Sequence, residues 1–324
     1  MRHVYPGRGP SLSGMIGARW LLAAVLAAGL LAGPAAGQLK PDGIQAERLD
    51  NGLKVLLLPD HDIPNVALYT FFRVGARNER SGLTGVSHFI EHMMFNGTRE
   101  IGPGEFDRRM EALGGSNNAY TSQDMTAYTD WFPASALEEM IRMEADRIQG
   151  LTFEEQVLES ERDVIVSERL MAVENDNDGL LEEQTLAAAI IAHPYHWGVI
   201  GWMSDICNWR REEILQYYRT YYAPSNAVLV LSGDFEPGRA LELIRRYYGP
   251  IPAGPPPPPV TTEEPAQLGQ RRVTLRREAL TSSFLMMFHV PGARHADFPA
   301  LQLLDRILLG GESGRLHRRL VRQD

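Results

Sequence analysis

The sequence predicts a layered α+β fold, in which helices pack on a mixed, largely antiparallel sheet, followed by the start of a second domain. Three observations support this prediction. Strand-like apolar segments are interleaved along the chain with helical ones, which is typical of layered domains. Asp50-Asn51-Gly52 lies between two apolar runs and favours a hairpin turn. Five consecutive prolines at 255–259 then divide the chain into two unequal parts.

The first domain is expected to cover residues 38–250. Two pairs, Ser135 with Glu138 and Thr152 with Glu155, have the spacing of capping boxes, so each is expected to open a helix. The predicted elements alternate in type along this domain: strands at 44–49, 53–58, 66–74 and 227–231, helices at 104–113, 135–148 and 211–221, and a helix beginning near 153.

The proline run begins a stiff polar linker, predicted at 251–270. A proline-rich ligand for a recognition domain is the alternative interpretation. The remaining residues, 271–324, are expected to form an incomplete second domain with strands at 272–276 and 283–290 and a helix at 299–309. Gly310-Gly311 is then expected to form a turn into a helix. The alternative is that this glycine-rich turn binds an anion. This stretch is too short to bury a core of its own, which indicates a fragment or a truncated product.

Composition limits the possible functions. The chain has 41 acidic and 32 basic residues and a net charge of −9, so it offers no basic face for nucleic acid. Its single cysteine, Cys207, excludes an internal disulfide framework. We expect Cys207 to be buried among apolar residues and not to act as a nucleophile.

The N-terminal residues 1–37 are typical of a secretory signal. Arg19 precedes an apolar run at 20–31, and small residues follow up to Gly37, the expected cleavage point. Translation is expected to start at Met1 or Met15. A membrane anchor is the alternative, but the apolar run is too short to favour a stable membrane span. The mature chain is therefore expected in the periplasm, if its source is bacterial.

The most informative motif lies at 88–92 and reads His-Phe-Ile-Glu-His. Glycines precede it and Asn96-Gly97 follows it, as expected for a short helix. Residues four apart share a helix face, so His88 and His92 can reach one metal ion, and Glu91 projects from nearly the same side. Two neutral imidazoles suit zinc, and a nearby carboxylate suits a general base. The alternative is two surface histidines and a solvated glutamate, which would leave the site without a third ligand.

The stretch 85–98, which contains this motif, resembles the signature of the pitrilysin/insulinase family of zinc peptidases. That family includes the mitochondrial processing peptidases. Its third zinc ligand is a glutamate about 75 residues after the second histidine, in a segment like 161–168. Glu168 fits this distance, and Glu161 fits a supporting glutamate one heptad earlier.

The resemblance implies one zinc ion per chain, bound by His88, His92 and Glu168. It implies that Glu91 takes the proton of an activated water and that Glu161 supports catalysis from beside the ligands. The implied activity is that of a metalloendopeptidase acting on peptides or short unfolded polypeptides.

A second block, 114–128, resembles the family's substrate strand, which pairs with an extended peptide through its backbone. The resemblance implies substrate-binding roles for Asn118, Ala119 and Tyr120, although the residues alone indicate only an ordinary strand after a glycine turn. His193, which precedes a proline, is expected to be a loop or core residue and not a ligand.

The resemblance also implies that the chain works with a partner. The family's substrate-clamping arginine would fall at Val321, and its tyrosine beyond Asp324. A second homologous half or a partner subunit is therefore expected to supply that pair and complete a chamber. Two alternatives differ in class from a peptidase: a non-catalytic structural or peptide-binding subunit of the same fold, and a zinc hydrolase that does not cleave peptides. The first would lack a ligand or the base, and the substrate-strand block disfavours the second.

Overall fold

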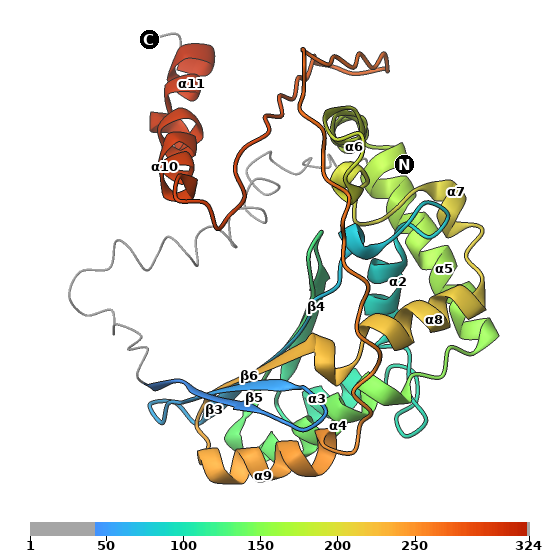
Figure 1. The fold of residues 1–324 in the computed structure, drawn as a ribbon, viewed down its shortest axis with the longest axis vertical. Coiled ribbons are helices and arrows are strands. Elements are labelled where there is room, and N and C mark those ends of the chain that lie inside the picture. Colours follow the sequence, from blue (N-terminus) through green and yellow to red (C-terminus); the bar gives the residue numbers. More distant parts are fainter. Residues whose placement is uncertain (1–42, 323–324) are drawn as a thin grey trace, which may run out of the picture. The chain divides into compact units, whose positions relative to one another are not determined.

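The computed structural model describes residues 43–322 (Figure 1). The predicted signal segment, 1–37, lies outside the described residues. No helix among residues 43–322 is both long enough and apolar enough to cross a membrane.

One six-stranded sheet organises the first part of the chain, in the order β1-β2-β6-β3-β5-β4. β2 runs parallel to β6, whereas β3 pairs antiparallel with both β5 and β6, and β4 pairs antiparallel with β5. The predicted mixed α+β fold is confirmed. The strand bounds are β1 Gln45–Arg48, β2 Lys54–Pro59, β3 Asn65–Phe72, β4 Ser116–Thr121, β5 Thr126–Pro133 and β6 Ala227–Gly233.

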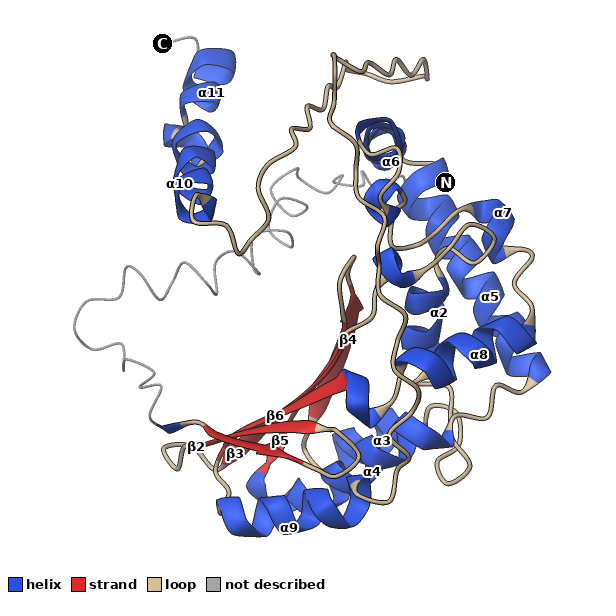
Figure 2. Ribbon diagram, in the orientation of Figure 1, coloured by secondary structure: helices blue, strands red, loops and turns tan. Residues whose placement is uncertain are grey.

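Strand periodicity explains which face of the sheet is covered. Along β3 the side chains of Val66, Leu68, Thr70 and Phe72 are buried, while the residues between them are only partly covered. The buried side meets three helices, α3 (Glu105–Ala112), α4 (Leu137–Gly150) and α9 (Pro237–Tyr248), which lie below the sheet in Figure 2.

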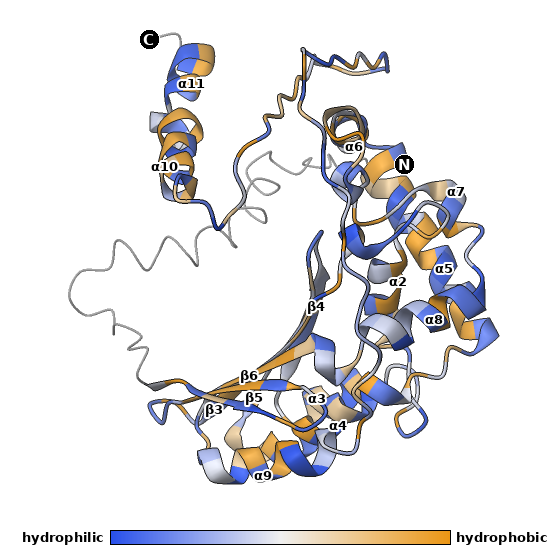
Figure 3. Cartoon of the chain, in the orientation of Figure 1, coloured by the Kyte–Doolittle hydropathy of each residue, from blue (hydrophilic) through white to orange (hydrophobic). Residues whose placement is uncertain are grey.

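α9 shows why such a segment becomes a helix of the core. Its buried residues, Ala240, Leu243, Ile244 and Tyr248, follow the helical period and form one apolar stripe. Glu236 caps its first turn by accepting hydrogen bonds from two backbone N–H groups. In Figure 3 the orange and blue faces of this helix are separated accordingly.

A second group of helices packs beside the sheet and carries the candidate site. α2 (Val86–Met93) contacts α5 (Glu155–Arg169), α8 (Arg211–Tyr221) and the strands β4 and β5. α5 continues into a π-helical turn, Leu170–Glu174. The helices that follow are α6 Asn177–Ala189 and α7 Met203–Ile206.

Both predicted capping boxes are wrong. A 3-10 turn occupies 134–136, so α4 begins only at Leu137, and no side chain caps it. α5 begins at Glu155, because Phe153 has a φ of +46° while its ring is buried against Tyr218. Cys207 is exposed and not buried, because it follows the short α7 on the surface.

The C-terminal part differs from its prediction. Residues 251–297 contain neither helix nor strand, so the strands predicted at 272–276 and 283–290 are wrong. Within the described chain these segments have no partner strand, and an unpaired strand leaves its backbone groups unsatisfied. The predicted helix is present as α10, Phe298–Leu309, followed by a glycine turn and the short α11, Arg315–His317.

Candidate metal centre

α2 is a short, mostly buried helix. Gly85 occupies its N-cap position with a φ of +84°, a conformation that favours glycine. Phe89, Ile90 and Met93 are buried and anchor the helix in the core. His88 and His92 lie one turn apart on another side, with ring centroids 4.6 Å apart.

The start of α2 is held by a buried carboxylate. Glu79 accepts hydrogen bonds from the backbone N–H groups of Gly85 at 2.7 Å and Ser87 at 2.8 Å. Burial raises the pKa of Glu79 to about 8 although both hydrogen bonds act to lower it. Asp205 accepts from the N–H groups of Gly82 and Thr84 in the preceding loop. The two carboxylates thus fix the position of the helix that carries the histidines.

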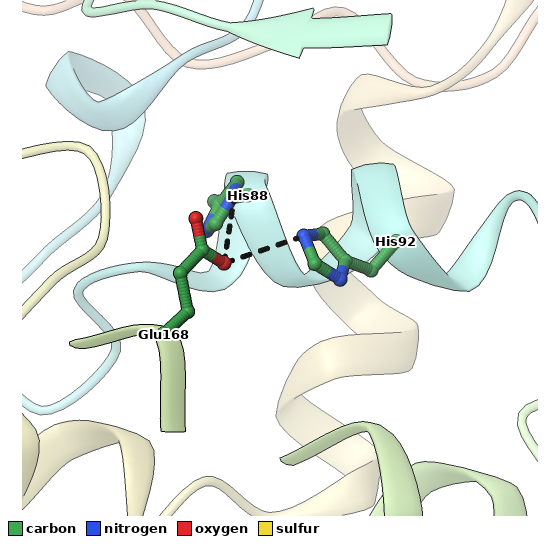
Figure 4. A group of neighbouring side chains, drawn as sticks. All are labelled: His88, His92 and Glu168. Atoms are coloured by element: carbon green, nitrogen blue, oxygen red, sulfur yellow. Dashed lines mark ion pairs between the residues drawn. The ribbon is translucent and has the colours of Figure 1, made fainter. Parts of the chain in front are cut away.

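Glu168 reaches the two histidines from the last turn of α5 (Figure 4). Its Oε2 lies 3.8 Å from Nε2 of His88 and 3.7 Å from Nε2 of His92. One ligand atom from each residue lies within 4.8 Å of the others, and this is the only such group among residues 43–322. The structure therefore brings the three predicted ligands together, although Glu168 lies 76 residues beyond His92 in the sequence.

The donor set fits a zinc ion. Zinc–ligand bonds of about 2.0–2.1 Å in a tetrahedron place ligand atoms about 3.4 Å apart, so small side-chain movements close the observed separations. His88 is nearly buried, and burial together with His92 lowers its pKa to about 3. Its imidazole is therefore neutral, the form that binds metal.

His92 is oriented by a carboxylate. Its Nδ1 lies 2.7 Å from Oε1 of Glu161. The hydrogen bond from His92 lowers the pKa of Glu161, so Glu161 is an acceptor and Nδ1 carries the hydrogen. In the neutral imidazole this tautomer leaves the lone pair on Nε2, which lies 3.7 Å from Oε2 of Glu168. Asn96 holds the other oxygen of Glu161 with a 2.7 Å hydrogen bond.

Glu91 lies beside His92 and makes its hydrogen bond to the sheet. Its side chain is mostly buried, and its Oε2 accepts a 2.5 Å hydrogen bond from the hydroxyl of Thr121, the last residue of β4. Burial raises the pKa of Glu91, although Thr121 and His92 act in the opposite direction. A carboxylate with a raised pKa is a stronger base than an exposed one.

A hollow lies beside the cluster, between α2, α5 and β4. Glu91, His92 and Glu161 line it, together with Asn118, Ala119 and the neighbouring residues Phe95, Asn96 and Asn117. Two of the three residues predicted to bind substrate are thus at this hollow. Tyr120 is not among its lining residues.

Some residues at the centre were not predicted from the sequence. The sequence predicts Asn96 to end a helix, and its position four residues after His92 places it on the same face. Thr121 and Glu79 lacked any local signal, because their partners come from other elements. His193 is a loop residue, as predicted: its Nδ1 accepts from the backbone N–H of Tyr195.

Comparison with known proteins assigns the family. The family model described as insulinase (peptidase family M16) matches residues 54–201, and the model described as peptidase M16 inactive domain matches 208–324. The chain belongs to the insulinase family of peptidases. The first match contains all three candidate ligands and Glu91, and the predicted family is confirmed.

Individual relatives agree with this assignment. The zinc protease PqqE of Helicobacter pylori is 31% identical over 277 residues, which are 84% of this chain and 62% of that protein. The crystal structure of a protease from Helicobacter pylori has a TM-score of 0.81 at 29% identity, over 86% of this chain and 68% of the other. The first half of the periplasmic protease PqqL from Escherichia coli has a TM-score of 0.63 at 26% identity, over 70% of this chain and 50% of the other. The chain thus spans about three fifths of the curated relative's length.

Proposed function

We propose that this chain is a zinc-dependent endopeptidase that hydrolyses peptides or short unfolded polypeptides. The observation that carries the proposal is the convergence of His88, His92 and Glu168 from two helices, with Glu91 in the hollow beside His92. Two histidines and one carboxylate form a donor set of zinc hydrolases, and a separate carboxylate beside it suits the general base. The family and the names of its zinc protease relatives support the same activity.

In this proposal His88, His92 and Glu168 hold the zinc ion. Bound zinc would polarise the scissile carbonyl and lower the pKa of a water molecule. Glu91 accepts the proton of that water at its carboxylate and then delivers it to the leaving amine. Glu161 keeps Nε2 of His92 directed at the metal through the hydrogen bond at Nδ1.

The substrate proposed for this site is an extended backbone. β4 lies at one end of the sheet order, and within the described chain it pairs only with β5. Its other edge offers backbone N–H and C=O groups to an added strand. Asn118 and Ala119 lie on this strand at the hollow, so a peptide that pairs there passes the candidate ligands. Only an extended or unfolded segment can pair in this way.

The metal content of the purified chain tests the proposal directly. We expect one zinc ion in the wild type and a loss of zinc in Glu168→Ala, measured by elemental analysis after dialysis. Glu159→Ala is the matched control, because Glu159 lies on α5 but is half exposed and pairs only with Arg162. A well-folded wild type without zinc, or a Glu168→Ala variant that retains it, would refute the assigned ligands.

Peptide turnover then separates an enzyme from a binding subunit. The assay uses a quenched fluorescent peptide with the chain alone and with a complementary second half. We propose that such a half or a partner subunit completes the chamber, as the first half of PqqL is itself one part of a longer protease. Stoichiometric zinc without turnover in both assays would instead identify a non-catalytic subunit.

Location and domain division complete the proposal. We propose that residues 1–37 are a secretory signal and that the mature chain works in the periplasm, as stated for PqqL. We propose a first domain at 38–250, a linker at 251–270 and an incomplete second domain at 271–324. The pairing of β6 with β2 and β3 supports placing the end of the first domain after β6, because the sheet is complete only after residue 233.

A further inference from the structure

A single hydrogen bond joins the candidate base to the candidate substrate strand. The hydroxyl of Thr121 lies 2.5 Å from Oε2 of Glu91. Thr121 ends β4 and is paired with Thr126 of β5, so the position of its backbone is set by the sheet. An ionised carboxylate only accepts hydrogen bonds, and the hydroxyl is therefore the donor.

The direction of the Thr121 side chain follows from the strand itself. Residues two apart on a strand project to the same side, so Asn117, Ala119 and Thr121 share one side. Asn117 and Ala119 line the hollow together with Glu91. The side of β4 that faces the hollow thus also supplies the hydroxyl that contacts the base.

Glu91 has little else to fix its carboxylate. Within the described chain, its side-chain hydrogen bond is the one from Thr121, which engages Oε2. The terminal torsion of a glutamate is broad and settles into no sharp rotamer. The Thr121 hydroxyl therefore selects one orientation and directs the remaining oxygen, Oε1, to other partners.

We propose that Thr121 is a positioning residue that fixes the carboxylate of Glu91 and thereby couples the strand that receives the peptide to the base that acts on it. This inference rests on the proposed function, since it assumes that Glu91 is the base. Thr121 keeps its own proton throughout: its Oγ–H donates to Oε2, while Oε1 accepts the proton from water and later releases it to the amine.

Three variants of the zinc-loaded chain test this role by steady-state peptide hydrolysis. Thr121→Val removes the hydroxyl and keeps the branched shape, and we expect kcat to fall by about 10- to 100-fold with KM nearly unchanged. Thr121→Ser keeps the hydroxyl and should restore kcat to within a few fold of the wild type. Thr220→Val is the control, because the hydroxyl of Thr220 bonds only Gln216 O on the exposed side of α8, and its kcat should not change.

Two kinetic outcomes would overturn the role of Thr121. One is a Thr121→Val variant with the kcat of the wild type. The other is a loss of kcat that Thr121→Ser does not restore, since a lost hydroxyl would then not be the cause. Zinc content and thermal unfolding are measured on each variant, and both are expected to match the wild type, because Thr121 is not a ligand and is only half-buried.

A readout without turnover separates this inference from the proposed function. Crystal structures of the wild type, Thr121→Val and Thr121→Ser should show the Glu91 carboxylate in one orientation in the first and third and rotated in the second. An unchanged Glu91 in Thr121→Val refutes the positioning role even if the wild type is active. If the wild type binds no zinc and cleaves no peptide, the proposed function fails, while the orientation of Glu91 still decides the role of Thr121.

Discussion

α2 and α5 contribute to the same centre from different surroundings. In α2 the buried residues are Val86, Ser87, Phe89, Ile90, Glu91 and Met93, and its start is held by the carboxylate of Glu79. In the longer α5 the buried residues are only Leu158, Ile165 and Arg169. The histidines are therefore partly buried on a helix that is anchored in the core, whereas the side chain of Glu168 is more exposed than that of either histidine.

The two helices contribute different groups to the site. α2 carries two ligands and the base within one buried turn, so the distance between metal and base is set by the helix itself. α5 carries one ligand and, one heptad earlier, the carboxylate that orients His92. A change at Glu91 should therefore separate catalysis from metal binding, whereas changes at Glu168 or Glu161 on α5 should act on metal binding first.

The largest effect is expected from Glu91→Gln. The amide cannot accept the proton of a water molecule, so kcat should fall by about 10²- to 10⁴-fold. Zinc content should stay that of the wild type, because Glu91 is not a ligand. Steady-state peptide hydrolysis and elemental analysis on the same preparation check both points. Full activity in this variant would show that Glu91 is not the general base.

Glu161→Gln is expected to act on the metal. Loss of the carboxylate weakens the orientation of His92, and outer partners of this kind typically change affinity by about 10- to 100-fold. Competition with a chelator of known zinc affinity measures the change. Glu159→Gln, two residues earlier on the same helix and half exposed, should leave the affinity unaltered. Equal effects of the two substitutions would contradict the supporting role of Glu161.

The smallest effect is expected on stability, through Glu79, which holds the start of α2. The pKa of Glu79 is raised from 4.5 to about 8, so between these values the folded chain keeps a proton that the unfolded chain has released. The free energy of unfolding therefore falls as pH rises through this window, by at most about 1.4 kcal/mol per pH unit from this group. Glu79→Gln cannot ionise and should lack this component.

Urea unfolding of the metal-free wild type and of Glu79→Gln, repeated across that window, measures the difference between the two. Contributions from His88 and His92 are common to both proteins and cancel. Curves that stay parallel from low to high pH would show that the pKa of Glu79 is the same in the folded and the unfolded chain, and would contradict the shift.

The sequence predicted what depends on neighbouring residues. The helix at 86–93 follows from glycines before it and Asn96-Gly97 after it, and the four-residue spacing placed His88 beside His92. Glu168 is 76 residues further on, and only the resemblance to a family connected it to the histidines. Its Oε2 lies 3.8 Å and 3.7 Å from their Nε2 atoms, and its role as a ligand stays a prediction.

Other features depended on partners that no local pattern reveals. The segments 272–276 and 283–290 have strand-like composition, yet no strand of the described chain lies beside them to complete their hydrogen bonds. Thr152 has the spacing of a capping box, but the buried ring of Phe153 holds the backbone out of the helix. Thr121 meets Glu91 only because the sheet and α2 pack together.

The free edge of β4 has a consequence for solubility. An open edge is a common starting point for aggregation, because it templates pairing with another molecule. Here the edge strand has only six residues, Ser116–Thr121, and three of its first four are Ser or Asn, which have little β-propensity. Two copies of such a strand gain little by pairing with each other, whereas an extended peptide with apolar side chains gains more. We therefore expect this edge to pair less readily with a second copy of itself than with an extended apolar peptide.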